Sequence, residues 1–177
     1  MSETVKVYSN AIFQLSVEEN LLDVVNQDLK FCADIIKEQP QFLAILSSPI
    51  VSNKEKISML QAVFEGNCND LVFNFICLLT EKNRINLFYE VQQDFAMQYN
   101  RFNNILEAKV TTCVPLTEEL RHKIVDKLCK TTGKKVSLVE TVDSSILGGV
   151  IIRYDNTVID DSIKTKFKEL SKQLHKH

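Results

Sequence analysis

The sequence has no tryptophan, few residues that interrupt helices and no long hydrophobic run. Only three prolines and four glycines occur in 177 residues, which favours helices over a loop-rich all-β fold. The longest uninterrupted apolar run covers residues 75–79, whereas a transmembrane helix needs roughly 20 apolar residues. The amino terminus resembles neither a secretory signal nor an organelle transit peptide. We therefore expect a globular protein that works in the compartment where it is made, unless a presequence precedes these residues.

Residues that carry out chemistry are equally scarce. The five cysteines form no Cys-x-x-Cys pair and no closely spaced Cys–His set, and several fall on apolar stripes, which is typical of reduced, buried thiols. Residues 130–135 lack the first glycine and the Ser or Thr of a phosphate-binding loop, and Gly148-Gly149 lacks the third glycine of a dinucleotide fingerprint. We expect no catalytic residue, no cofactor and no metal ion. A reactive thiol at Cys32 or Cys77 would instead support an enzymatic function.

Charge divides the sequence into two parts. Residues 1–103 carry 8 basic and 13 acidic side chains, whereas residues 104–177 carry 13 basic and 10 acidic ones. The hydrophobic pattern changes at the same place, from a helical period to strand-like alternation. We therefore predict two domains, 1–103 and 104–177.

The lysines after residue 122 leave an alternative function open. Lys123, Lys127, Lys130, Lys134 and Lys135 could contact RNA, but their segment has no aromatic side chain on which a base could stack. We interpret these lysines first as a solvated helix face, second as a surface for an acidic protein partner, and third as an RNA-binding surface. The alternative function is therefore a helical RNA-binding regulator that uses the 123–135 face.

The first domain is predicted to be all-α, a compact six-helix bundle. Two capping boxes, Ser16–Glu19 and Ser52–Glu55, mark helix starts, and Pro40 and Gly66 mark helix ends. The predicted helices are 4–15, one from Ser16 to Pro40, 41–46, one from Ser52 to Gly66, one capped by Asp70 that covers 71–80, and 88–102. The 71–80 helix is apolar almost all round, which indicates either plain core or a groove for a partner helix.

The second domain is predicted to be a small α+β domain with the order β-α-β-β-α. Residues 105–114 alternate as a strand does, and Thr117 and Gly133 mark the two ends of a helix. Residues 136–142 and 150–154 predict further strands, and residues 155–161 a polar turn. Four apolar residues at helical spacing predict a terminal helix: Ile163, Phe167, Leu170 and Leu174. Gly148 and Gly149 are predicted to form the backbone bend before the last strand.

Three segments resemble one known family. They are similar to motifs of the delta subunit of the rotary F-type ATP synthase. The segments are the opening Tyr8-Ser-Asn-Ala-Ile-Phe13, the corner Glu81-Lys-Asn-Arg84, and Lys134 to Arg153 followed by Val158-Ile-Asp160. The mitochondrial relative is the oligomycin-sensitivity-conferring protein, and the missing transit peptide favours a bacterial version. The sequence departs from the family pattern at Ser9, Asn10 and Asn83, and the resemblance spans the whole chain.

The resemblance implies a non-catalytic stator subunit that joins the catalytic head to the peripheral stalk, so that proton-driven rotation is coupled to ATP synthesis. It implies that the first domain binds the N-terminal helices of the alpha subunits and that the second binds the C-terminal end of the b subunit. No nucleic acid is expected as a partner. The protein is expected at the cytoplasmic face of the cell membrane, held there only through the complex. The candidate groove residues are Tyr8, Ala11, Ile12, Leu15, Phe75, Leu78 and Leu79.

Overall fold

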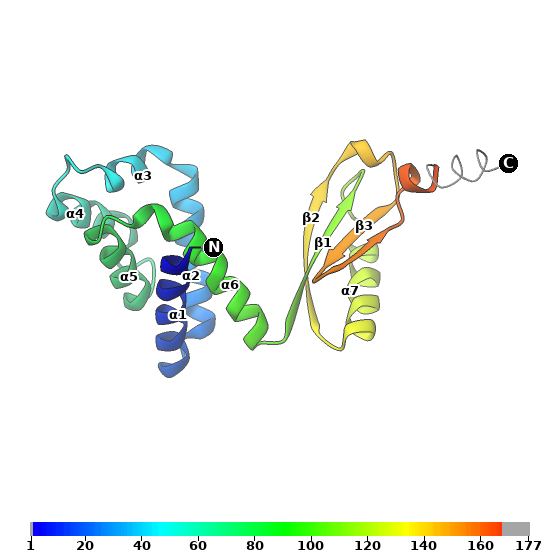
Figure 1. The fold of residues 1–177 in the computed structure, drawn as a ribbon, viewed down its shortest axis with the longest axis horizontal. Helices are drawn as coiled ribbons and strands as arrows, with labels where there is room; N and C mark the ends of the chain where they lie inside the picture. The colour runs from blue at the N-terminus through cyan, green and yellow to red at the C-terminus, as the bar shows by residue number, and fades with distance from the viewer. Residues whose placement is uncertain (1, 168–177) are drawn as a thin grey trace. The chain divides into compact units, whose positions relative to one another are not determined.

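The computed structural model describes residues 2–167 and divides the chain into two compact units, Met1–Tyr99 and Asn100–His177 (Figure 1). The first unit is built from helices. They are α1 (Glu3–Glu18), α2 (Leu22–Glu38), α3 (Pro40–Ser47), α4 (Asn53–Phe64), α5 (Asp70–Glu81), the 3-10 turn η1 (Ile85–Leu87) and α6 (Phe88–Phe102), whose last residues belong to the second unit. Each of α1 to α6 contributes buried apolar side chains to one hydrophobic core.

Side-chain caps start α1, α4 and α5, whereas α2 and α3 have none, and two predicted caps lie elsewhere. The Ser52 capping box is confirmed, because Ser52 Oγ accepts from the backbone N–H of Glu55 and Glu55 Oε2 accepts from that of Ser52. The predicted box at Ser16 is wrong: Ser16 is buried inside α1 and its hydroxyl donates to the carbonyl of Ile12 at 2.6 Å. A serine bonded to the carbonyl four residues earlier leaves the helix free to continue.

The start of α5 is fixed by Asn69 rather than by Asp70. The Asn69 side chain accepts from the backbone N–H of Leu71 at 2.9 Å, so the predicted cap is one residue too late. Asp28 of α2 holds the same turn, because its Oδ2 accepts from the backbone N–H of Asn69 at 2.7 Å. Helix α5 therefore begins at a point that is tied to α2.

The second unit contains a mixed four-stranded sheet with helix α7 packed against it (Figure 1). Its elements are β1 (Ile105–Thr112), α7 (Glu118–Thr132), β2 (Lys135–Val142), the 3-10 turn η2 (Ser144–Ile146), β3 (Val150–Tyr154) and β4 (Thr157–Asp160). The strand order is β2-β1-β3-β4, with β1 parallel to β2 and the other neighbours antiparallel. The alternation predicted for the first strand is confirmed for the buried Leu106, Ala108 and Val110, but the strand ends at Thr112 and Val114 is exposed.

Strand β4 was not predicted from the sequence, so the predicted element order is incomplete. Its four residues are all exposed and lie at the edge of the sheet, and therefore they show no alternation of buried and exposed residues. Residues 163–167 are helical, as predicted for the start of a terminal helix. The rest of that prediction, Leu170 and Leu174, lies outside the described residues.

The two adjacent glycines occupy a turn against the segment that follows β4. Gly149 has a φ of +82°, and a Cβ atom added to it would lie 2.2 Å from the carbonyl oxygen of Asp161. The same segment donates backbone hydrogen bonds back to the turn, from Asp161 to Val150 at 2.9 Å and from Ile163 to Gly148 at 3.0 Å. Any side chain at Gly149 would therefore push these two segments apart.

The cysteines are free thiols and not an oxidised framework. Cys32 is fully buried on α2, and its thiol interacts with that of Cys68. Burial raises the pKa of the Cys32, Cys68 and Cys77 thiols, so the reactive thiolate is disfavoured at each of them.

Replacing Gly149 tests the close approach at this turn. We expect Gly149→Ala to lower the free energy of unfolding of the second unit by about 3 kcal/mol, because a left-handed φ and a steric clash add together. Native-state hydrogen exchange of the β1 and β3 amides measures this loss. Gly133→Ala is the matched control, since Gly133 has a φ of +69° but no atom within 4 Å of an added Cβ. It should cost only about 1–2 kcal/mol, and equal losses would contradict the role of the close approach.

Thiol labelling tests the protonated state of Cys32. We expect a maleimide at pH 8 to modify the half-buried Cys129 in the native protein and to leave Cys32 unmodified, because a buried thiol with a raised pKa carries almost no thiolate. Peptide mass spectrometry after timed quenching reads each site separately. Fast modification of Cys32 before unfolding would show an accessible, reactive thiol and contradict this account.

Candidate partner-binding groove

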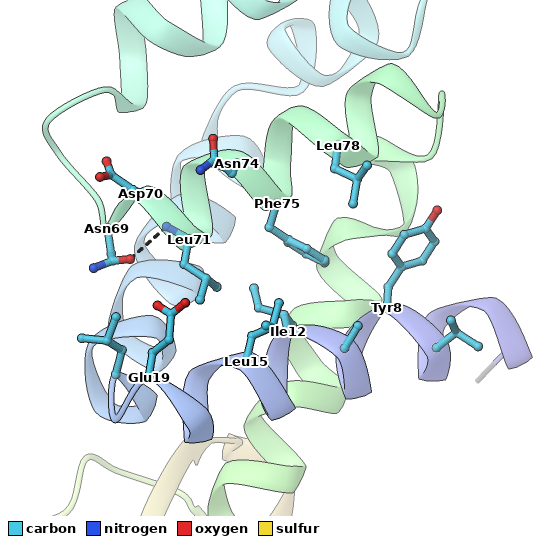
Figure 2. A pocket seen from close by; sticks show the side chains of 13 residues that line it. Tyr8, Ile12, Leu15, Glu19, Asn69, Asp70, Leu71, Asn74, Phe75 and Leu78 are labelled. Atoms are coloured by element: carbon cyan, nitrogen blue, oxygen red, sulfur yellow. Dashed lines mark hydrogen bonds between the residues drawn. The ribbon is translucent and has the colours of Figure 1, made fainter.

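An elongated cavity of about 710 Å³ lies between α1 and α5 (Figure 2). Its lining residues come from α1 with the turn after it, and from the first three turns of α5 with its N-cap. They are Val7, Tyr8, Ala11, Ile12, Leu15, Glu19, Leu21, Asn69, Asp70, Leu71, Asn74, Phe75 and Leu78. Most of them are apolar, so the cavity is suited to an apolar side-chain stripe and not to a small polar ligand.

The structure brings six of the seven sequence-predicted residues to this groove. Tyr8, Ala11, Ile12, Leu15, Phe75 and Leu78 all line it. Leu79 does not, because it is fully buried in the core of the unit. Neighbouring residues on a helix point about 100° apart, so Leu78 and Leu79 cannot both face the same groove.

The groove has a buried floor and exposed apolar walls. Ile12 and Phe75 form the floor, with only 1% and 8% of their surfaces exposed. Val7, Leu15 and Leu78 are 62%, 48% and 41% exposed on the walls. Three large exposed apolar side chains around one concavity are unusual for a surface that stays in water, and such patches mark interaction sites.

Sequence reasoning missed several lining residues, some of which had a signal. Val7, Ala11 and Leu15 recur every four residues, so a stripe that contains Ala11 and Leu15 also includes Val7. The polar members Asn69, Asp70 and Asn74 carry no such periodic signal. They reach the groove because Asn69 caps α5 there, and that placement depends on tertiary structure.

Arg84 contacts Tyr8 at one end of the groove. Its Nη1 donates to Tyr8 Oη at 3.2 Å, and its guanidinium carbon lies 5.6 Å from the centre of the Tyr8 ring, within the range of a cation–π contact. The Tyr8 ring in turn meets Phe75 edge-on at 6.3 Å. The two shorter segments that resemble the family, the opening around Tyr8 and the corner that ends at Arg84, therefore contact each other in the folded chain.

The corner that presents Arg84 is itself fixed. Asn83 adopts a left-handed φ of +52°, and the backbone N–H of Arg84 donates to the carbonyl of Leu79 at 2.7 Å. Lys56 of α4 is almost completely buried, and its Nζ donates to Asn83 Oδ1 at 3.4 Å. The position of Arg84 thus depends on contacts among α4, α5 and the corner.

Helix α1 is held in place on the side away from α5. The hydroxyl of the buried Ser9 donates to Asp94 Oδ2 of α6. Gln98 Nε2 of α6 donates to Ser9 Oγ at 3.0 Å and to Asn10 Oδ1 at 2.9 Å. Neither Ser9 nor Asn10 lines the groove, so these contacts hold α1 without entering the groove.

Outside the groove, the described residues carry neither a metal-binding cluster nor a membrane-spanning helix. Residues 2–167 contain no group of three or more His, Cys, Asp or Glu residues that could hold a metal ion. No helix within them is long and apolar enough to cross a membrane. A second, smaller cavity of about 280 Å³ lies among α2, α3 and the start of α6.

The lysines of the alternative RNA-binding function come from α7, the turn after it and β2. Lys123, Lys127 and Lys130 are exposed on α7, whereas Lys135 lies in β2. Lys134 pairs with Asp155 at 3.6 Å. A solvated helix face accounts for this arrangement.

Comparison with known proteins identifies the family. A family model described as the ATP synthase delta (OSCP) subunit matches residues 5–174. ATP synthase subunit delta of Clostridium botulinum (strain Loch Maree / Type A3) is 32% identical over 96% of this chain and 94% of its own length. The Lachnoclostridium phytofermentans subunit is 32% identical over 97% of this chain and 94% of its own length. The chloroplastic subunit of Galdieria sulphuraria is 29% identical over 92% and 93%, respectively.

A solved structure supports the fold. A chain in the cryo-EM structure of the Toxoplasma gondii mitochondrial ATP synthase hexamer superimposes with a TM-score of 0.73 and 24% identity, covering 98% of each chain. None of these matches supports an RNA-binding regulator. The chain belongs to the ATP synthase delta (OSCP) subunit family, the non-catalytic stator component of the F-type ATP synthase peripheral stalk.

Proposed function

We propose that the α1–α5 groove binds the N-terminal helix of an alpha subunit of the catalytic head. The observation that carries this proposal is the combination of the exposed walls, Val7, Leu15 and Leu78, with the buried floor formed by Ile12 and Phe75. An amphipathic helix that lies in such a groove places apolar side chains at i, i+4 and i+7 against the floor. Helices α1 to α6 act in this proposal as one six-helix bundle that presents the groove.

The energetics suit a static link. Burying apolar surface contributes roughly 25 cal/mol per Å², and the exposed wall residues would be covered together with the apolar stripe of the partner. Because both walls are anchored to other helices, the groove is formed before the partner arrives. A pre-formed site loses little conformational entropy on binding, which favours a long-lived complex. A stator requires such a complex and requires no chemistry of its own.

We further propose that the second domain predicted from the sequence, residues 104–177, binds the C-terminal end of the stalk b subunit. Its support is a set of exposed apolar side chains around the β3–β4 edge and the segment after it. They are Leu147, Val158, Ile159, Ile163 and Phe167, which are 42% to 73% exposed. Through these two attachments the chain would sit at the cytoplasmic face of the membrane as a peripheral part of the complex, holding the head against rotation.

A substitution at the groove wall tests the first attachment. We expect Leu78→Asp to weaken binding of an alpha-subunit N-terminal peptide to the full chain by about 2 kcal/mol or more, because it removes an apolar anchor and would bury an unpaired charge. Isothermal titration calorimetry gives the dissociation constants. Ile50→Asp is the matched control, since Ile50 is 93% exposed in the same unit but does not line the groove. Unchanged binding by the Leu78 variant, at unchanged thermal stability, would refute the groove assignment.

A further inference from the structure

We propose that the groove selects the order of charges along the helix that occupies it, with a basic side chain over Glu19 and Asp70 and an acidic side chain near Arg84. This inference rests on the proposed function, because it takes an amphipathic helix of the alpha subunit as the occupant. It specifies the direction in which the bound helix lies in the groove and the charges that this helix carries, neither of which apolar burial alone determines.

One end of the groove is acidic. Glu19 follows the last residue of α1 and Asp70 is the first residue of α5, and Figure 2 shows both near the Asn69 end of the cavity. They are the only charged residues among those that line it. Neither forms a salt bridge with any residue in the described range 2–167. A cationic side chain of the occupant would therefore find two carboxylates that the chain itself leaves unpaired.

The opposite end is basic. Figure 2 shows Tyr8 and Leu78 at this end, and Tyr8 accepts a hydrogen bond from Arg84. A guanidinium group has five N–H donors, and the contact with Tyr8 uses one of them. Arg84 has no carboxylate partner within residues 2–167. It can therefore receive a carboxylate of the occupant while it still holds the Tyr8 hydroxyl.

The spacing of these charges sets a length for the occupant. Tyr8 of α1 and Glu19, the residue after α1, are eleven residues apart, which corresponds to roughly 16 Å or three helical turns. The occupant should thus carry its basic and acidic side chains about eleven residues apart, on either side of the apolar stripe. The Debye length is about 8 Å at physiological salt, so the charges at the two ends act almost independently. Each end therefore disfavours an occupant side chain of like charge.

A site-specific spin label on the peptide tests the direction. We would use an amphipathic helical peptide with a basic residue at one end of the stripe, an acidic residue about eleven positions away, and a nitroxide label at the basic end. In the wild-type full chain, the label should broaden the amide signals of Asn69 and Leu71 and spare those of Tyr8 and Leu78. A Glu19→Lys, Asp70→Lys, Arg84→Glu variant should bind the same peptide reversed, with broadening at Tyr8 and Leu78. Glu18→Lys is the control, because Glu18 is exposed on α1 but does not line the groove.

A milder variant keeps the test valid if the triple substitution prevents folding. With Glu19→Gln and Asp70→Asn, we expect binding at low salt to weaken by about three- to tenfold, with broadening at both ends of the groove, because exposed ion pairs contribute only weakly to affinity. The same broadening in wild type and variants would overturn the charge order while leaving the apolar groove intact. No binding of any peptide would refute the proposed function itself. A dimer of the chain that Leu78→Asp abolishes would assign the groove to a second copy and overturn the inference.

Discussion

The groove depends on α1 and α5 being held apart by contacts that do not fill the space between them. Asp28 fixes the start of α5 through the backbone N–H of Asn69, and Arg84 joins the corner after α5 to Tyr8 of α1. Ser9 and its partners on α6 hold α1 from the opposite side. Because these polar contacts lie at the ends and behind the walls, apolar side chains such as Leu15 and Leu78 remain exposed around the buried floor. A partner helix can therefore add its burial energy to a site that already exists.

Periodicity predicted most of this arrangement, and its failures have physical causes. The Ser52 capping box is a local interaction, so the sequence specifies it completely, whereas the similar pattern at Ser16 lies inside α1 because packing favours continuation of the helix. Strand β4 was not predicted because its residues are all exposed, so its sequence lacks the alternating hydrophobic pattern that indicates a strand. Leu79 was assigned to the groove because an almost wholly apolar helix does not reveal from its sequence which side faces the core. The acidic end of the groove depends on the tertiary position of α5.

The non-catalytic role follows from the family to which the chain belongs and not from any single residue. Burial keeps the Cys32 thiol protonated, and residues 2–167 bring no metal-binding set together. Membership of the ATP synthase delta (OSCP) subunit family explains why the distinctive features of the chain are turns and apolar surfaces. The Gly148–Gly149 turn allows a close backbone approach within the second unit, whereas the groove suited to a partner helix belongs to the first unit.

Amide chemical-shift mapping of the full chain tests the central claim most directly. The isotope-labelled protein would be titrated with an unlabelled peptide that copies the N-terminus of the alpha subunit. The account predicts that the largest shift changes occur along α1 and α5, at Val7, Ala11, Leu15, Leu71 and Leu78. Changes centred instead on the smaller cavity near Ala33, Leu43 and Phe88, or on the second unit, would contradict it.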